Sequence, residues 1–258
     1  MSVHDSGHGE PRTVILCGAT SAVAVALGRR LAARGWRLHL LGRDVGRLEA
    51  IAADLRVRGA AAVSCSPFDA ADIPAIPAVF TAAVRALPAP LDGAIVCHGF
   101  LPDESGRLPS PEELRRSIDV NFISVAILLS LAAEHLAGRR GAFLAAISSV
   151  AGDRGRQSNF CYGSAKAGLS AWLSGLRNRL QPSGIRVLTI KPGIIDSPMT
   201  AGLTVGPKAL ITTPDAVAAD IERAILRNAD VVYTPWFWLP IMTVIRAIPE
   251  PVFKRLRM

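Results

Sequence analysis

The chain carries TVILCGATSAVAVALGRRLAARG at residues 13–35, and this stretch decides the fold. Thr13–Cys17 is an apolar run of strand length, a glycine turn follows at Gly18, and Val23–Arg34 then has apolar residues at helical spacing. Gly35 stands where a helix C-cap is expected. A strand, a glycine turn and a helix in this order predict the first unit of a parallel sheet with helical crossovers.

The same alternation continues along the chain. We expect further strands at Arg37–Leu41, Ala61–Cys65, Ala94–Cys97, Ala142–Ile147, Ile185–Ile190 and Val231–Tyr233. We expect further helices at Gly46–Arg58, Ile76–Ala86, Glu112–Leu136, Tyr162–Gln181 and Pro214–Arg227. No linker divides the chain, so the pattern predicts one doubly wound, Rossmann-type α/β domain at 13–258 with a mostly parallel sheet of about seven strands. A disordered tail at 1–12 precedes it, and 231–258 is an apolar C-terminal extension.

The composition also indicates one large domain. Half of the 258 residues are hydrophobic and 19% are charged. The net charge is +8, but the basic residues are spread along the chain with few aromatics between them, so we expect no nucleic-acid binding. The first twelve residues contain no apolar stretch, and Val231–Val244 contains two prolines and is too short to span a bilayer. We therefore expect a cytoplasmic protein without a secretory signal.

The cysteines indicate neither disulfides nor a metal. A chain of this size with four cysteines is not a disulfide framework, and none of them has metal-ligand spacing. We expect reduced thiols that pack as small residues at Cys17, Cys65, Cys97 and Cys161, and no metal site.

The turn after the first strand is suited to a dinucleotide. A tight turn here brings the N-terminus of the next helix, with its free N–H groups, to a pyrophosphate. Gly18 supplies the turn, Thr20 and Ser21 add hydroxyls, and Ala22 and Ala24 stand where such loops usually carry further glycines. The signal is weak on its own, since an ordinary strand-to-helix turn has the same form.

The end of the second strand favours NADP(H) over NAD(H). An acidic residue at this place binds the ribose 2′-OH of NAD, whereas here the position reads Gly42 and is followed by Arg43, which suits a 2′-phosphate. Asp44 is placed to cap the next helix. Asp69, after the third strand, either accepts a bond from the adenine amino group or caps its own loop.

A tyrosine and a lysine form the candidate catalytic pair. Tyr162, one of only two tyrosines, stands four residues before Lys166, so both lie on one face of the expected helix. A nearby ammonium group is expected to lower the pKa of the phenol, which is ordinarily near 10. Ser149 follows a strand and therefore points into the crevice where such sheets bind ligands.

These residues resemble the short-chain dehydrogenase/reductase family over nearly the whole chain. Ile147–Gly152, the Tyr162/Lys166 pair, Asn121 and Lys191-Pro192-Gly193 stand in the family's order and spacing. The resemblance implies that Tyr162 is the general acid in ketone reduction or the base in alcohol oxidation, and that Lys166 tunes it and holds the nicotinamide ribose. It further implies that Ser149 binds the substrate oxygen and that Asn121 anchors a proton-relay water.

The resemblance also implies a bound NADP(H). The residues expected to bind it are Gly18, Thr20, Ser21, Ala22, Val23, Arg43, Asp69, Ala70, Cys97, His98, Gly99, Tyr162, Lys166, Pro192, Gly193, Ile195 and Ser197. One departure is Cys97-His98-Gly99, where the family usually has Asn-Ala-Gly. His98 is either a hydrogen-bonded structural residue or has a role in binding or proton transfer. Family members form dimers and tetramers, so a homodimer or homotetramer is implied.

Two segments bear on the substrate. Arg154 and Arg156 precede Tyr162 and either meet an anionic group of the substrate or are solvated surface charges. The extension at 231–258 is apolar and aromatic with a basic end, and it either packs over the substrate pocket or a subunit partner, or lies on a membrane surface. One branch of the family, which contains the reductase of decaprenylphosphoryl-2-keto-erythro-pentofuranose, is similar to this chain in the Gly18–Ser21 turn, the Ala151–Arg156 loop, Asn159–Tyr162 and the Ile248–Arg255 tail.

The sequence therefore predicts an NADP(H)-dependent oxidoreductase that interconverts a ketone and a secondary alcohol, with a keto group on a lipid-linked sugar as the implied substrate. The alternative within enzymes is a reductase of 3-oxoacyl thioesters or other hydrophobic ketones. The alternative outside enzymes is an NADP(H)-sensing binding protein. Replacement of Tyr162 by Phe separates the enzymes from the sensor.

Overall fold

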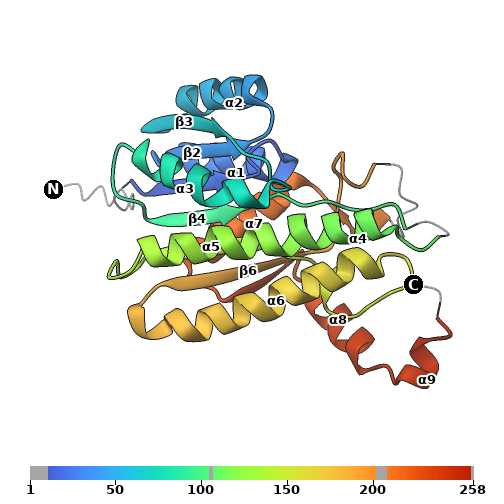
Figure 1. Cartoon of the computed structure of the whole chain (residues 1–258). Helices are drawn as coiled ribbons and strands as arrows, with labels where there is room; N and C mark the ends of the chain where they lie inside the picture. The colour runs from blue at the N-terminus through green and yellow to red at the C-terminus, as the bar shows by residue number, and fades with distance from the viewer. Residues whose placement is uncertain (1–10, 105–106, 202–207, 257–258) are drawn as a thin grey trace.

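The structure is a computed structural model, and it describes residues 11–104, 107–201 and 208–256. The predicted N-terminal tail at 1–12 lies almost entirely outside these residues. Seven strands form one sheet in the order β3-β2-β1-β4-β5-β6-β9, and every neighbouring pair is parallel (Figure 1). The strands are β1 Thr13–Cys17, β2 Arg37–Gly42, β3 Ala62–Pro67, β4 Gly93–Val96, β5 Phe143–Ile147, β6 Arg186–Pro192 and β9 Val231–Thr234. The predicted doubly wound sheet is confirmed.

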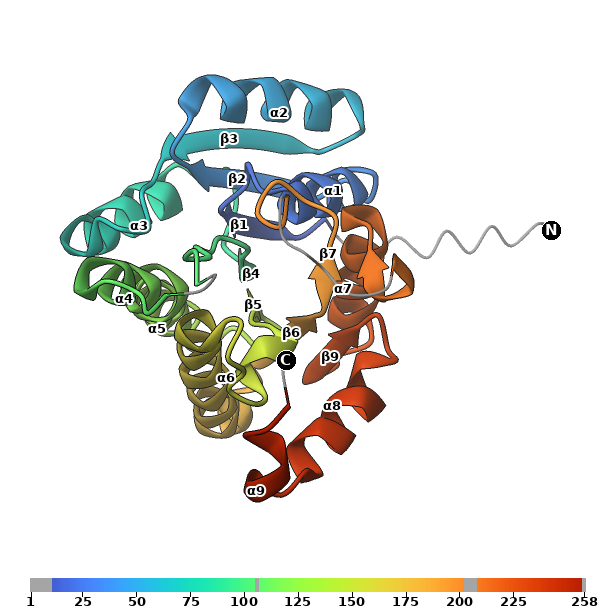
Figure 2. The same ribbon diagram turned by 90° about the vertical axis from the view of Figure 1, so that its right-hand side faces the viewer.

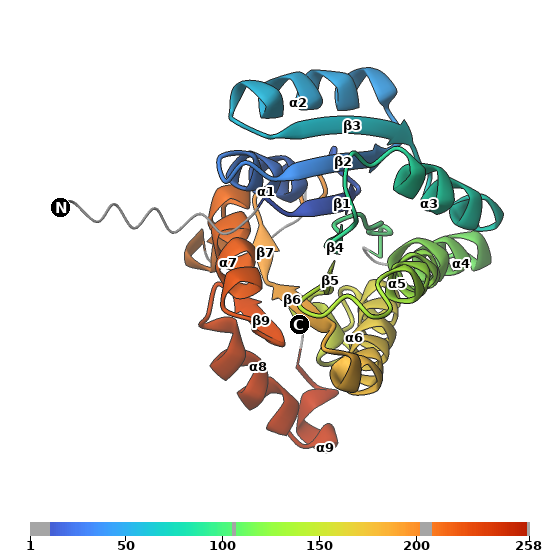
Figure 3. The same cartoon turned by 90° about the vertical axis from the view of Figure 1, so that its left-hand side faces the viewer.

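Helices cover both faces of the sheet, as Figure 2 and Figure 3 show. One face packs on α1, α2 and α7, and the other on α3, α5 and α6. The helices are α1 Ala22–Ala32, α2 Val45–Val57, α3 Ile76–Arg85, α4 Pro111–Ile118, α5 Ser124–His135, α6 Phe160–Leu180, α7 Pro214–Leu226, α8 Trp238–Ala247 and α9 Glu250–Phe253. Two short strands, β7 Ile194–Ile195 and β8 Ile211–Thr212, pair beside the main sheet.

The helix predicted at Glu112–Leu136 is interrupted. Asp119–Ile123 forms a π-helical turn between α4 and α5, and the candidate residue Asn121 lies at its centre. Helical spacing predicts the helix but not the π turn, which is frequent at functional sites. A second correction concerns the end of α1: its C-cap is Ala33, and Gly35 lies two residues further on in a left-handed conformation with φ of 72°.

By length and composition alone, Pro111–His135 could cross a membrane, since its mean hydropathy is 1.6. In the fold its two helices pack against α3 and α6, and nearly half of the segment is buried. A core helix of a globular domain passes the same test, so this segment is weak support for a membrane span.

The C-terminal extension is folded onto the edge of the sheet. Trp238, Met242 and Ile245 on α8 are buried and form a small third core with Val150. Figure 2 shows α8 and α9 beyond β9, at the edge of the domain. The extension thus packs against the segment that follows Ser149.

Candidate active site

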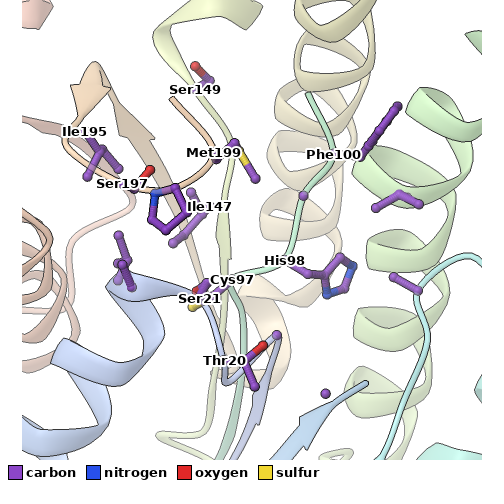
Figure 4. Close-up of a pocket in the computed structure, with 18 of the residues that line it drawn as sticks. Thr20, Ser21, Cys97, His98, Phe100, Ile147, Ser149, Ile195, Ser197 and Met199 are labelled. Carbon is purple, nitrogen blue, oxygen red and sulfur yellow. The ribbon is translucent and has the colours of Figure 1, made fainter. Parts of the chain in front are cut away.

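A cavity of about 430 Å³ lies at the carboxyl ends of the central strands. Of the predicted site residues, all seventeen proposed for the cofactor and Ser149 line it, whereas Asn121 does not. Figure 4 shows several of these side chains, which come from the turn after β1, the loop after β4 and the segment after β6. One cavity therefore unites residues that are almost 180 positions apart in the sequence.

The turn after β1 fits a phosphate group. Gly18 has φ of +71°, and a Cβ there would lie 2.6–2.8 Å from His98, so only glycine is accommodated. Ser21 is the N-cap of α1 and accepts a bond from the Ala24 N–H at 3.2 Å. The N–H groups of the next two residues, Ala22 and Val23, are the free donors of a helix N-terminus, and both residues line the cavity.

Two arginines stand at the end of the cavity formed by β2. Arg43 and Arg47 line it, are exposed, and make no ion pair within the described residues. Asp44 accepts a bond from the Arg47 N–H at 2.9 Å, which confirms it as the cap of α2. Asp69 accepts from the Ala71 N–H at 3.0 Å and also lines the cavity, so it caps its loop and an adenine contact stays a prediction.

Tyr162, Ser149 and Lys166 form the polar centre of the cavity. Ser149 and Tyr162 are joined by a side-chain hydrogen bond, and the Ser149 hydroxyl also accepts from the Ala151 N–H at 3.0 Å. Lys166 Nζ lies 5.7 Å from the centre of the Tyr162 ring and donates to the Ile147 carbonyl at 2.8 Å. An acid, a hydroxyl donor and an ammonium group therefore share one wall.

Burial shifts the pKa values of both groups of the candidate catalytic pair. Burial raises the pKa of Tyr162 to about 12, and the hydrogen bond with Ser149 only partly opposes this rise. Burial also lowers the pKa of Lys166 to about 8. Lys166 is not among the causes of this shift, so its expected lowering of the pKa of the phenol stays a prediction.

Asn121 holds the loop that follows β4. Its side chain is fully buried, its amide oxygen accepts from the Phe100 N–H at 3.0 Å, and its nitrogen donates to the Phe100 carbonyl at 2.7 Å. Both ends of the amide are thus occupied by one loop residue. The predicted role of Asn121 in a proton relay is not tested by these contacts.

His98 is a neutral, mostly buried residue. One ring nitrogen, Nε2, lies 2.9 Å from the Ser124 hydroxyl, and the other, Nδ1, is buried without a partner in the described structure. Burial, assisted by the charge of Lys166, lowers the pKa of His98 to about 3. The hydrogen bond supports the structural interpretation of His98.

The segment after β6 forms the wall opposite the first turn. Pro192, Gly193, Ile195 and Ser197 line the cavity as predicted. A Cβ on Gly193 would overlap the indole of Trp238, so the C-terminal extension packs directly behind this wall.

Arg154 and Arg156, the two arginines before Tyr162, do not line the cavity. For Arg154, the structure corrects both predictions, which were a contact with an anionic substrate and a solvated surface charge. Its guanidinium donates to the carbonyls of Ile245, Arg246 and Ile248 at 2.5–3.0 Å and pairs with Glu250 at 2.8 Å. The Arg154 side chain is only 15% exposed. It is therefore neither a substrate contact nor a solvated charge, but fixes α8 and α9.

Several lining residues were not among the predicted site residues. They are Gly42, Arg47, Phe68, Ala71, Phe100, Arg116, Val120, Ile147, Ser148, Pro198, Met199 and Thr200. Arg47 could have been found, since it follows Arg43 by four residues at the start of a helix. Phe100 and Met199 lie in irregular segments, for which helical and strand spacing give no signal.

The cysteines are free thiols, as the sequence predicts. All four thiols are free, and Cys17, Cys97 and Cys161 are buried. The described ranges contain no group of three or more metal-ligating side chains.

Known proteins with similar sequences and structures place the chain in a family. The family model described as short chain dehydrogenase matches residues 12–207, and the chain belongs to this family. Uncharacterized oxidoreductases of Mycobacterium tuberculosis and Streptomyces coelicolor are 36% and 35% identical over 94% and 96% of the chain, and over 96% and 97% of their own lengths. A short-chain dehydrogenase of Sphingobium yanoikuyae, solved in complex with NADPH, is 26% identical with a TM-score of 0.78, covering 93% of this chain and 97% of that one. The chain is thus an oxidoreductase of the short-chain dehydrogenase type, and its substrate is a small molecule.

Proposed function

We propose that the protein reduces a ketone to a secondary alcohol with NADPH, and catalyses the reverse reaction with NADP⁺. The observation that carries the proposal is the hydrogen-bonded Tyr162 and Ser149 beside Lys166 in the same cavity as Arg43 and Arg47. The Sphingobium structure with NADPH supports the choice of cofactor.

The residues present fit the cofactor. The amides at the start of α1 suit its pyrophosphate, and Arg43 and Arg47 suit a 2′-phosphate because their guanidinium groups have no carboxylate partner in the described chain. Gly42 leaves no carboxylate to repel that phosphate. When bound, NADPH supplies the hydride.

Tyr162 donates the proton in the proposed reaction. Its raised pKa keeps the phenol protonated, as an acid must be, until a ketone oxygen gains negative charge. Ser149 keeps its hydroxyl hydrogen for that oxygen, while a lone pair of the same hydroxyl accepts from the Ala151 N–H. Lys166 holds a positive charge in the partly desolvated wall and favours the phenolate that remains.

The test replaces Tyr162 with Phe. We expect kcat for a ketone to fall by about 10²–10⁴-fold, because the proton donor is lost, while the Kd for NADPH stays within about threefold. Tyr233→Phe is the matched control, since it removes the other tyrosine hydroxyl, which donates to Asp153 at 2.8 Å outside the cavity. A Tyr162→Phe protein with wild-type turnover would contradict the proposal, and binding of NADPH without any turnover in the wild type would favour the sensor.

The finer proposal is that the ketone is part of a lipid-linked sugar. The resemblance to the polyprenyl-phosphoryl-sugar branch supports it, and so do exposed apolar side chains on the extension. The comparisons do not favour a 3-oxoacyl-thioester reductase. Since Arg154 is bound by residues of α8 and α9, its replacement does not separate the two substrates.

The exposed side chains of the extension suit an anionic membrane surface. Its exposed apolar side chains include Trp236, Leu239, Val244, Val252 and Leu256; Trp236 is 76% exposed and Val244 66%. The cations Arg246, Lys254 and Arg255 of the same segment are also exposed, and the carboxylate of Glu250 is already paired with Arg154. Aromatic and aliphatic side chains flanked by cations are the combination that binds anionic lipid.

Sedimentation with vesicles tests this contact. We expect binding to vesicles that contain phosphatidylglycerol and little binding to pure phosphatidylcholine, with a loss of at least about tenfold in affinity when Trp236 and Val244 are changed to Ser. Val57→Ser is the control, since Val57 is 89% exposed on α2. Equal sedimentation of the wild type and the double variant would contradict the contact.

The family resemblance also implies a homodimer or homotetramer, formed through the outer sides of α5 and α6. Light scattering of the purified protein measures its mass, and a monomer at micromolar concentration would contradict this assembly.

A further inference from the structure

Glu104 lies in the loop after β4 and reaches the start of the helix that carries Tyr162. Its carboxylate accepts from the Cys161 N–H at 2.9 Å and from the Tyr162 N–H at 3.1 Å. The residue is 7% exposed, and 57 positions separate it from its first partner. These two N–H groups are unpaired donors of the first turn of α6, which an N-cap side chain ordinarily satisfies.

The local N-cap residue does not perform this task. Asn159 occupies the cap position of α6 but makes no capping bond, and its side-chain oxygen is buried without a partner in the described structure. Glu104 therefore takes the place of the N-cap from a distant loop. Its negative charge also faces the positive end of the α6 dipole, which favours an ionised carboxylate there.

The same loop is fixed at a second point. Asn121 binds both the N–H and the carbonyl of Phe100, and the residues between β4 and Phe100 line the cofactor side of the cavity. The loop is thus joined to the π turn at Phe100 and to the backbone of Tyr162 at Glu104. The second connection sets the position of the tyrosine relative to the wall formed by Cys97, His98 and Gly99.

We propose that Glu104 is a positioning residue, which places the Tyr162 phenol for proton transfer by binding the first turn of α6. The inference rests on the proposed function, since it assumes that Tyr162 is the proton donor. Loss of the carboxylate lets the first helical turn of α6 fray and displaces the phenol from the substrate oxygen. The turn after β1 and Arg43, which are proposed to bind the cofactor, are untouched.

The experiment compares Glu104→Ala, Glu104→Gln and Glu104→Asp. We expect kcat for ketone reduction to fall by about 10- to 100-fold in the Ala variant, since small displacements of a catalytic group have effects of this size. We expect the Kd for NADPH to change by less than about threefold. Gln keeps one acceptor and Asp keeps the charge, so both should recover part of kcat. Glu134→Gln, which neutralises an exposed carboxylate near the end of α5, is the control.

Hydrogen exchange gives a readout that does not depend on activity. We expect the amides of Cys161 and Tyr162 to exchange at least about tenfold faster in Glu104→Ala, with no change at the centre of α6. Wild-type exchange in this variant would overturn the inference, as would faster exchange with an unchanged kcat, or equal losses in kcat and in NADPH binding.

Failure of the proposed function is distinguishable from failure of this inference. If Tyr162→Phe keeps its turnover, then Tyr162 is not the proton donor. In that case, only the exchange rates of the Cys161 and Tyr162 amides test whether Glu104 caps α6. If Glu104→Ala does not fold, then Glu104→Gln supplies the same comparison, because it has the same shape.

Discussion

Arg43 and Arg47 beside the cavity differ from Arg154 beside the C-terminal extension in what surrounds their guanidinium groups. The first two are exposed and have no ion-pair partner in the described chain, whereas Arg154 binds three carbonyls and a carboxylate and stacks on Phe253. An arginine whose guanidinium donates to several protein acceptors stabilises the fold. An arginine in a cavity whose guanidinium has no carboxylate partner is available to a ligand. In the sequence, all three arginines stand in loops or at the start of a helix. Their roles are therefore distinguished only by the guanidinium partners that the structure shows.

The same contrast applies to the two regions as a whole. Near the extension, Asp153 binds both Lys191 and the Tyr233 hydroxyl, so its carboxylate is fully used. Burial, together with the hydrogen bond and charge of Asp153, raises the pKa of Tyr233. In the turn after β1, by comparison, the N–H groups at the start of α1 are free to bind a ligand. We infer that the contacts around the extension stabilise the fold, whereas the turn after β1 binds a ligand.

The largest expected effect comes from Gly18. Changing it to Ala should destabilise the protein by about 2–4 kcal/mol, because a left-handed backbone and an overlap with His98 are combined. Gly35→Ala is the matched control, since Gly35 has nearly the same φ but nothing within 4 Å of an added Cβ, and about 1 kcal/mol is expected there. Urea unfolding measures both values. Equal losses would show that the close approach of the first turn to His98 has no energetic weight.

Replacement of Arg154 by Ala should have the next largest effect. We expect a loss of about 2 kcal/mol, since hydrogen bonds from a charged group to several carbonyls disappear. Limited proteolysis should then cleave first within 231–256. Arg43→Ala is the control and should leave the unfolding free energy unchanged. If Arg154→Ala lowered turnover without altering stability or proteolysis, a direct role with substrate would have to replace the structural one.

Much of the fold and the site could be predicted because the signals are local. Strand-length apolar runs, helical spacing and the Tyr162/Lys166 interval need no knowledge of distant residues. The contacts of Arg154 could not be predicted, since its partners lie 91 to 96 positions away. Glu104 escaped for the same reason. The π turn around Asn121 escaped because one extra residue in a helical turn leaves the apolar pattern nearly unchanged.

Acidification should lower the free energy of unfolding by a smaller amount, through two mostly buried histidines outside the C-terminal extension. Burial lowers the pKa of His39 to about 4, and that of His98 to about 3. The unfolded chain therefore binds protons below pH 6.5 that these imidazoles do not bind in the fold, so stability is present at pH 7 and is lost as the pH falls. Each imidazole should contribute about 1–2 kcal/mol between pH 7 and pH 5.

The extension contains no histidine, so acid should weaken the two regions unequally. Urea unfolding of the wild type and of His98→Gln at both pH values measures the difference, and the variant should be less sensitive to acid. A variant with the same sensitivity as the wild type would mean that His98 is not held neutral in the fold.

The most direct test of the central claim is a fluorescence titration of the wild-type protein with NADPH and, separately, with NADH. If the unpaired Arg43 and Arg47 bind a 2′-phosphate, NADPH should bind at least about tenfold more tightly, and Arg43→Ala with Arg47→Ala should remove most of that preference. Equal affinity for the two cofactors in the wild type would contradict the claim that these arginines are left unpaired for a ligand.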